Sequence, residues 1–211
     1  MFSRLMWCWK NVIIVGTSHV EVDVYARLRR YFVKFRPKVV ALELDNARYH
    51  GLYLKSRRSL SWGGVLGWVQ DAIGKGMGVQ PGDDMRAADR LAKNFQAKVV
   101  CIDRPLSVTL SRLKSSLSFR EKWLLCKDII SVFFVRSKVV MPKEADIFSM
   151  IELLRVRFPS MYRVLVTERD EVLGKNLYNL SKSTKGKVIA VVGAGHIPGM
   201  KKVMKCLQKK S

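Results

Sequence analysis

Two of the three histidines stand in matching sequence contexts that could place them at one reactive centre. Residues 12–19 are Val-Ile-Ile-Val-Gly-Thr-Ser-His, and residues 189–196 are Ile-Ala-Val-Val-Gly-Ala-Gly-His. Each segment predicts a buried strand, then a glycine that permits a sharp turn, then a histidine at the entrance of a helix. Because α/β proteins bind ligands at the carboxyl ends of their strands, His19 and His196 would converge if the two strands are neighbours.

A carboxylate that would complete such a centre lies in a third apolar run, Val39–Leu44. Glu43 stands inside this run, where a carboxylate is costly unless it is paired or bound to a cation. Two imidazoles and one carboxylate suit a divalent transition metal and leave coordination positions open. The pattern therefore predicts a metal site of His19, Glu43 and His196. The alternative is that each histidine is a hydrogen-bonded structural residue or a helix cap; His50 lacks this context and is expected at the surface.

The elements that would position these residues alternate between strands and helices. Apolar residues three and four apart over residues 20–35 predict a helix that ends before Pro37. Further strands are predicted at 39–44, 98–102 and 187–192, and further helices at 85–95, through most of 106–166 and from about Met200. The alternation predicts an α/β fold with a largely parallel central sheet flanked by helices and a mostly helical insertion. The two strand–Gly-x-x-His–helix units would meet at the carboxyl edge of the sheet.

The length and composition indicate one folded domain over residues 1–211, with a core at about 11–58 and 83–207. Residues 59–82 are rich in glycine and serine and predict a mobile insertion. Hydrophobic residues make up 48% of the chain, which excludes a disordered basic tail, and charged residues make up 27%, which excludes a polytopic membrane protein.

Several familiar sites are absent from the sequence. There is no Gly-Lys-Ser/Thr phosphate loop, and the glycines at 193, 195 and 199 are spaced one residue too widely for a dinucleotide fingerprint. The cysteines form no C-x-x-C pair, and three of the four have apolar neighbours, so we expect reduced, buried thiols. The N-terminal residues lack the apolar core of a signal peptide, which favours a cytoplasmic location.

The formal net charge of +22, from 39 Lys and Arg against 17 Asp and Glu, suggests acidic partners. Residues 104–143 alternate basic with apolar side chains, which is typical of an amphipathic helix on the anionic inner face of a membrane. Non-specific binding of nucleic acid is a second expectation from this charge, and a solvated basic face is the alternative to both.

With these motifs, the sequence resembles the TraB (pheromone shutdown) family. The resemblance rests on Gly-Thr-Ser-His-Val at 16–20, on Arg-Pro-Lys-Val-Val-Ala-Leu-Glu-Leu-Asp-Asn-Ala-Arg-Tyr at 36–49, and on Val-Val-Gly-Ala-Gly-His-Ile-Pro-Gly at 191–199. Shorter blocks between them are Met-Arg-Ala-Ala at 85–88, Asp-Arg-Pro at 103–105 and Glu-Arg-Asp at 168–170. The blocks stand in the expected order, and the resemblance covers roughly residues 11–205.

TraB proteins are related to the Tiki metalloproteases and, more distantly, to ChaN-like haem-binding and erythromycin-esterase-like proteins. The resemblance implies divalent-metal-dependent cleavage of a peptide or another small amide or ester, such as a signalling peptide. The metal would be Mn, Co or Zn, with His19, Glu43 and His196 at the centre. Alternatives are a peptide-binding domain without catalysis, or a basic module for anionic membrane or nucleic acid; a homo-oligomer is also compatible.

The remaining block residues are candidates for the same site. Substrate contacts are expected from three arginines and three turn glycines: Arg48, Arg104, Arg169, Gly16, Gly193 and Gly195. Glu168 could add a fourth metal ligand or a general base. The alternative for Arg48, Arg169 and their acidic neighbours is a structural charge network at the ends of the strands, and we favour that role for Asp170.

Overall fold

The computed structural model describes residues 5–17, 23–53, 82–135 and 147–210. The chain divides into two compact units. The sheet unit comprises Met1–Leu106 and Arg169–Ser211, and the helical unit comprises Ser107–Glu168. The predicted glycine-rich insertion at 59–82 lies almost entirely outside the described residues.

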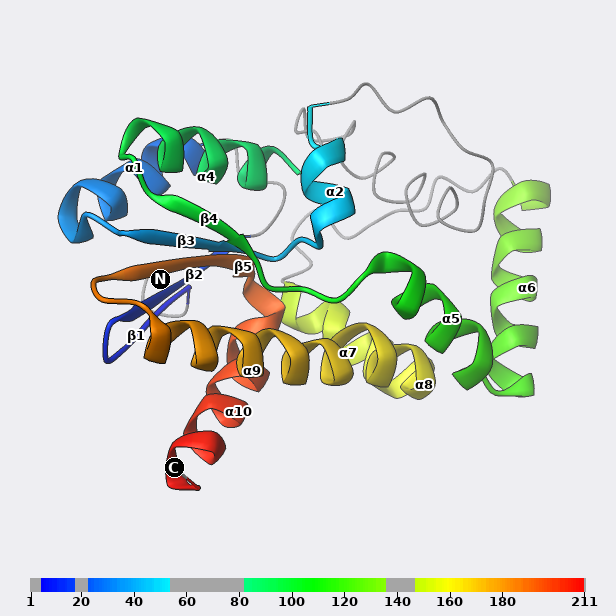
Figure 1. Ribbon diagram of the computed structural model, residues 1–211. Helices are drawn as coiled ribbons and strands as arrows, with labels where there is room; N and C mark the ends of the chain where they lie inside the picture. The colour runs from blue at the N-terminus through cyan, green and yellow to red at the C-terminus, as the bar shows by residue number, and fades with distance from the viewer. Residues whose placement is uncertain (1–4, 18–22, 54–81, 136–146, 211) are drawn as a thin grey trace. The chain divides into compact units, whose positions relative to one another are not determined.

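A five-stranded sheet forms the centre of the sheet unit, in the order β1-β2-β5-β3-β4 (Figure 1). The strands are β1 (Met6–Trp9), β2 (Val12–Thr17), β3 (Val39–Leu42), β4 (Lys98–Cys101) and β5 (Val188–Gly193). The last four are parallel, and β1 pairs antiparallel with β2. The predicted α/β fold with a largely parallel sheet is therefore confirmed.

Helices cover both faces of this sheet (Figure 1). They are α1 (Val24–Phe35), α2 (Asn46–Gly51), α4 (Asp83–Asn94), α9 (Glu168–Ser183) and α10 (Ile197–Lys209), with the short turn η3 (Ala194–His196) before α10. Alternate strand residues divide the core in two: Ile13 and Val40 pack toward α1 and α4, whereas Ile14 and Ala41 pack toward α9 and α10. A period of two is what a sheet buried on both faces requires.

The two strands that precede the Gly-x-x-His turns are direct neighbours. β2 and β5 run parallel, with Gly16 opposite Val192 and Thr17 opposite Gly193. A side chain could not be added to Gly16 without displacement, because its Cβ would stand 2.6 Å from Cδ1 of Ile197. The predicted adjacency of the two strands is thus present, and Gly16 lets the end of β2 approach the start of α10.

Two features of the chain were not anticipated from the sequence. Strand β1 is only four residues long, and its contacts are distant in sequence: the Trp9 ring packs on Tyr178, and its N–H donates to Gln208. The expectation of buried cysteines was wrong, because Cys8, Cys126 and Cys206 are exposed and Cys101 is only partly buried. A cysteine on a helix can have apolar neighbours in sequence while those neighbours point to another face.

The helical unit is built from α5 (Leu106–Ser116), α6 (Phe119–Val135), α7 (Ile147–Arg157), α8 (Pro159–Tyr162) and the π-helical turn η2 (Arg163–Thr167). Its core joins Leu113, Leu117 and Val164. Pro159 begins a helix, where a missing backbone N–H costs nothing. In the described part of the chain, no helix combines the length and the apolar character needed to cross a membrane.

Glu121 links two helix starts in the helical unit. Its Oε2 accepts hydrogen bonds from the N–H and the hydroxyl of Ser118, both 2.9 Å, and the hydroxyl of Ser118 accepts from the N–H of Glu121. Its Oε1 accepts from the N–H of Ser160 at 2.7 Å. Burial by itself raises the pKa of Glu121, but these hydrogen bonds outweigh burial and hold that pKa below its usual value.

This arrangement predicts a pH-dependent contribution to stability. Because the pKa of Glu121 is lower in the folded chain, its ionised form stabilises the fold above the unfolded pKa of about 4.3, and that contribution is lost as the pH falls through the folded pKa. Glu121→Gln should lower the free energy of unfolding by about 1–2 kcal/mol at neutral pH, and the deficit should shrink in acid. Urea unfolding of the wild type and of Glu121→Gln, at neutral pH and in acid, measures this difference in the free energy of unfolding. A deficit that is independent of pH would contradict the assignment; Glu152→Gln, at an exposed pair with Arg155, is the control and should change little.

Candidate functional site

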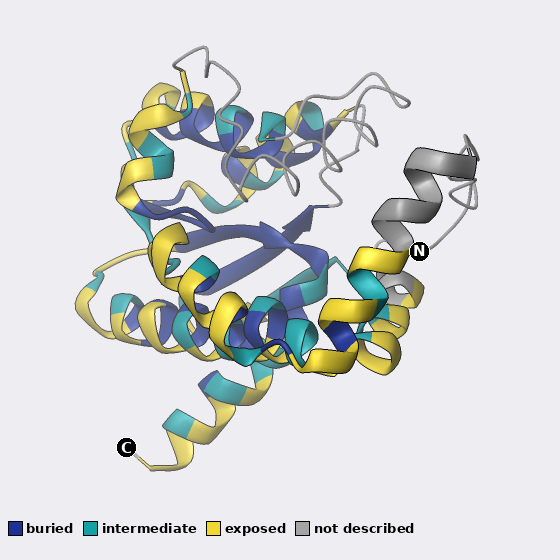
Figure 2. Ribbon diagram, turned by 90° about the vertical axis from the view of Figure 1, so that its right-hand side faces the viewer, coloured by how far each residue is buried: buried dark blue, intermediate teal, exposed yellow. Residues whose placement is uncertain are grey.

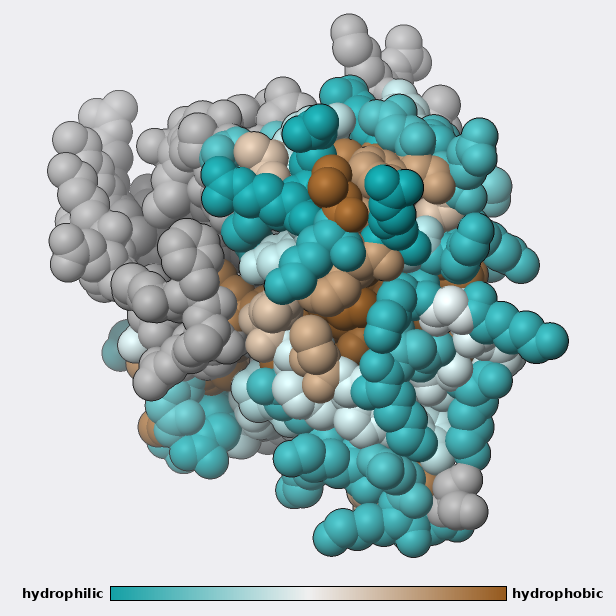
Figure 3. All heavy atoms as spheres, turned by 90° about the vertical axis from the view of Figure 1, so that its left-hand side faces the viewer, coloured by the Kyte–Doolittle hydropathy of each residue, from teal (hydrophilic) through white to brown (hydrophobic). Residues whose placement is uncertain are grey.

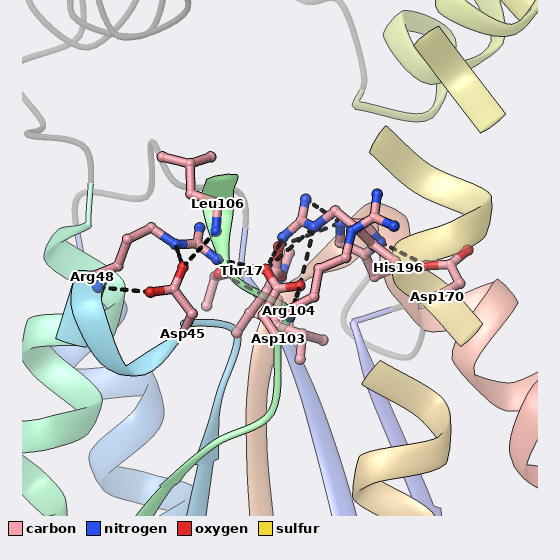
Figure 4. Close-up of polar contacts among 12 residues, drawn as sticks. Thr17, Asp45, Arg48, Asp103, Arg104, Leu106, Asp170 and His196 are labelled. Atoms are coloured by element: carbon pink, nitrogen blue, oxygen red, sulfur yellow. Dashed lines mark hydrogen bonds and ion pairs between the residues drawn. The ribbon is translucent and has the colours of Figure 1, made fainter. Parts of the chain in front are cut away.

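Polar side chains collect where the four parallel strands end (Figure 4). Thr17 is the last residue of β2 and Gly193 is the last residue of β5. Glu43 directly follows β3, and Asp103 stands two residues after β4. Because parallel strands end at one edge of a sheet, these residues gather on that edge, as expected for ligand sites in α/β folds.

The end of the sheet unit where these strands begin faces the viewer in Figure 3, and its surface is mostly hydrophilic around a small apolar patch.

Glu43 is buried, with 7% of its surface exposed, and both of its oxygens have partners. Oε2 accepts a hydrogen bond from the N–H of Gly193 at 2.6 Å. Oε1 accepts from the guanidinium of Arg169 at 2.5 Å and lies 3.3 Å from Nε2 of His196. Glu43 was expected to be paired or bound to a cation, and the structure shows it paired.

His196 is held between two carboxylates. Its Nδ1 lies 2.6 Å from Oδ1 of Asp170, so Nε2 is the nitrogen directed toward Glu43. Burial by itself disfavours the imidazolium, but the charge of Glu43 and the hydrogen bond to Asp170 outweigh burial and raise the pKa of His196 to about 9. Burial also raises the pKa of Asp170. Asp170 therefore fixes the orientation of the His196 ring.

Arg169 is the centre of the cluster. Its guanidinium binds Glu43 and, at 2.6 Å, Oδ2 of the buried Asp103, and it lies 3.3 Å from Nε2 of His196. Burial by itself would lower the pKa of Arg169, but the two carboxylates outweigh burial and raise it. One cation thus joins the ends of β3 and β4 to the start of α10.

A second arginine extends the network to α2. Asp45 caps this helix by accepting from the N–H of Arg48 at 2.9 Å. The guanidinium of Arg48 in turn contacts Asp45 and Asp103, both at 2.7 Å. Asp103 therefore accepts from two arginines.

Asp84 reaches the same edge from the start of α4. Its exposed fraction is 1%, and its Oδ2 accepts a hydrogen bond from the hydroxyl of Thr17 at 2.6 Å. Its Oδ1 accepts from the N–H of Met85. A pocket of about 230 Å³ opens between these elements, lined by Glu43, Leu44, Arg48, Gly82, Asp84, Met85, Arg169 and His196.

Comparison with known proteins supplies the family. The model of the TraB/PrgY/gumN family matches residues 66–211. This chain belongs to that family. An uncharacterized protein of Methanocaldococcus jannaschii is 30% identical over 94% of this chain and 54% of its own length. The human and mouse TraB domain-containing proteins are each 26% identical over 91% of this chain and 62% of theirs. The chain thus spans between half and two thirds of the length of these relatives.

The structure of this TraB-family chain brings together several of the residues predicted from the sequence. Glu43 and His196 are in contact, and Arg169 lies against both. Gly193 contributes its N–H to Glu43, and Gly195 belongs to η3 beside His196. His19 lies outside the described residues, so its predicted convergence with His196 stays a prediction.

The other predicted residues have different surroundings. Arg48 pairs with two carboxylates, and Arg104 lies next to Asp103, to which its N–H donates (Figure 4). Glu168 belongs to the helical unit, where it forms an ion pair with Arg112 at 2.8 Å. The role of Glu168 as a metal ligand or a general base stays a prediction.

Sequence reasoning did not assign Thr17, Asp45 or Asp84 to the site. Gly82 occupies the N-cap position of α4, so Asp84 lies in the first turn of the helix, where its side chain is buried. A signal was available for Asp45, because an aspartate just after a strand and three residues before Arg48 is typical of a helix cap.

Two of the residues present, Glu43 and His196, have the spacing that two ligands of the divalent metal implied by the TraB resemblance would need. Oε1 of Glu43 and Nε2 of His196 are 3.3 Å apart, close to the separation of about 3.3 Å between two ligands that bind one ion at about 2.0–2.1 Å in tetrahedral geometry. Asp170 on the other ring nitrogen is the usual second partner of a metal-binding histidine. The described residues contain no group of three metal-binding side chains. The third predicted ligand, His19, lies outside them, and Arg169 shares Oε1 of Glu43.

Proposed function

We propose that this chain is a divalent-metal-dependent hydrolase that acts on a peptide or another small amide or ester, and that inactivation of a signalling peptide is its role. The observation that carries the proposal is the contact between Glu43 and His196 on the wall of a pocket at the carboxyl edge of the sheet. Membership of the TraB/PrgY/gumN family supports it.

His19, Glu43 and His196 would hold the ion, and when bound it would polarise the substrate carbonyl and lower the pKa of a bound water. Asp170 orients the imidazole of His196 through Nδ1. The N–H of Gly193 fixes one oxygen of Glu43 and leaves the other directed toward His196. In this position Glu43 serves as a ligand or as the base that accepts the proton of the attacking water.

Metal content tests the proposal directly. The full chain is stripped with a chelator, loaded separately with Mn²⁺, Co²⁺ or Zn²⁺, dialysed and analysed for bound metal. We expect one ion per chain with at least one of the three metals, and a large loss of it in Glu43→Gln and His19→Ala. His50→Ala removes an exposed histidine and should retain full occupancy. Occupancy near zero in the wild type, or occupancy unchanged in His19→Ala, would reject the metal site.

Turnover is measured on the loaded protein with a fluorescence-quenched peptide library. Removing a general base or a metal ligand should lower the rate by about 100-fold or more, so Glu43→Gln should be nearly inactive. His50→Ala should match the wild type. Cleavage that persists in Glu43→Gln would show that another protein or another site is responsible.

A peptide-binding domain without catalysis is the second candidate, and one observation favours it. Arg169 and Arg48 already neutralise Glu43 and Asp103 within the chain, so the cluster is complete as a charge network. This candidate predicts that library peptides bind the pocket and are recovered intact. Cleavage that depends on the added metal would exclude it.

A further inference from the structure

The outward face of α6 is unusual for a helix exposed to water. With 100° between successive residues, Phe119, Trp123 and Cys126 lie along the centre of one face. The inward face carries Glu121, which is 2% exposed, and Leu125, which packs on the core of the helical unit. The face that would ordinarily carry polar side chains therefore has two aromatic rings at its centre.

These two rings are well exposed. The exposed fraction is 86% for Phe119 and 58% for Trp123. In Figure 2 the first half of α6 is mostly yellow, the colour of exposed residues. Large aromatic side chains side by side in water mark an interaction site rather than a neutral surface.

Basic residues border the aromatic rings on both sides. By the same helical geometry, Lys122 lies on one flank, and Arg120 and Lys127 lie on the other. The ammonium of Lys127 stands 5.6 Å from the centre of the Trp123 ring. The single acidic residue among residues 119–127 is Glu121, which points inward. This face is therefore apolar at its centre and positive at its margins.

We propose that this face of α6, defined by Phe119, Arg120, Lys122, Trp123 and Lys127, docks on an anionic lipid bilayer. An interfacial helix buries its apolar centre at the boundary between headgroups and acyl chains, while flanking cations extend to the lipid phosphates. Tryptophan is favoured at that depth. The net charge of +22 adds a long-range attraction to an anionic leaflet. A nucleic-acid duplex would be attracted by the charge, but it gives no reason for an apolar centre between cations. Single-stranded nucleic acid, whose bases could stack on the two rings, is an outcome that the test distinguishes.

Vesicle flotation of the full chain tests the proposal independently of the hydrolase. Wild-type protein should float with vesicles of phosphatidylcholine and phosphatidylserine, and much less with phosphatidylcholine alone. Phe119→Ser/Trp123→Ser should bind the anionic vesicles at least about tenfold more weakly, because two buried aromatic side chains are lost. Lys122→Glu/Lys127→Glu should lose a similar amount, and less so at high salt.

Two matched variants separate this surface from general stickiness and charge. Leu153→Ser/Val156→Ser removes exposed apolar residues of α7, and Lys202→Glu/Lys205→Glu makes the same change of charge on α10. Both should bind anionic vesicles nearly as well as the wild type. Equal loss in these controls, equal binding to neutral vesicles, or binding of single-stranded or duplex DNA that is weakened by the Phe119/Trp123 change while vesicle binding is not, would overturn the proposal. Far-ultraviolet circular dichroism verifies that each variant is folded.

Discussion

Arg169→Met is expected to lower the free energy of unfolding by about 3–5 kcal/mol, the loss that follows when one partner of a buried ion pair is removed. Arg169 is the cation shared by Glu43 and Asp103, whose exposed fractions as side chains are 7% and 1%. Methionine keeps much of the volume but removes the guanidinium that pairs with Glu43 and one of the two guanidinium groups that pair with Asp103. Urea unfolding followed by circular dichroism measures the change.

A second arginine serves as the control for Arg169→Met. Arg112 also forms an ion pair with a glutamate, Glu168, but it is half exposed, so Arg112→Met should change stability little. Arg169→Lys keeps the charge without the planar fork that contacts two carboxylates, and it should recover part of the loss. If Arg169→Met and Arg112→Met unfold at the same urea concentration, the cluster is not a stabilising network.

The sequence was a good guide to the elements that local patterns specify. The apolar runs at 12–15 and 187–192 became neighbouring parallel strands, because continuous apolar runs are buried on both sides of a sheet. Glu43 was identified by the same logic, since a carboxylate in such a run needs a partner. Which partner it takes was not visible in the sequence.

The contacts that complete the cluster join residues far apart in the chain. Arg169 lies 126 residues from Glu43, and Asp84 lies 67 residues from Thr17. Charged residues at strand ends have several partners of opposite sign within reach, and the choice depends on how the helices pack. Strand β1 was missed for a similar reason: its stability comes from Tyr178 and Gln208 and not from its own pattern.

Arg169 has opposite consequences for the two candidate functions. It stabilises buried carboxylates in the resting chain, yet it occupies the same oxygen of Glu43 that a metal would use. If the metal binds, part of its binding energy is spent on moving the guanidinium. An Arg169 variant that remains folded should therefore bind the metal more tightly than the wild type does.

Gly199→Ala should destabilise the fold, because the new methyl group would overlap the carboxylate of Asp170. The added Cβ would stand 2.8 Å from Cβ of Asp170 and would collide with its Cγ and Oδ2. Alanine gains up to about 1 kcal/mol in a helix relative to glycine, whereas overpacking costs about 1–3 kcal/mol. Overpacking should prevail here because Asp170 cannot withdraw without losing its 2.6 Å contact with His196.

Gly51→Ala is the control for Gly199→Ala, since no atom lies within 4 Å of the Cβ that it would add to α2. Thermal unfolding should show a loss for Gly199→Ala and little change or a slight gain for Gly51→Ala. In an Asp170→Ala background the overlap with Cγ and Oδ2 disappears and only the 2.8 Å approach to Cβ remains, so Gly199→Ala should then cost less. Strictly additive losses would show that Gly199 matters for a reason other than Asp170. If His196 binds metal, displacing Asp170 should also weaken metal affinity by about 10–100-fold, an effect that Gly51→Ala should lack.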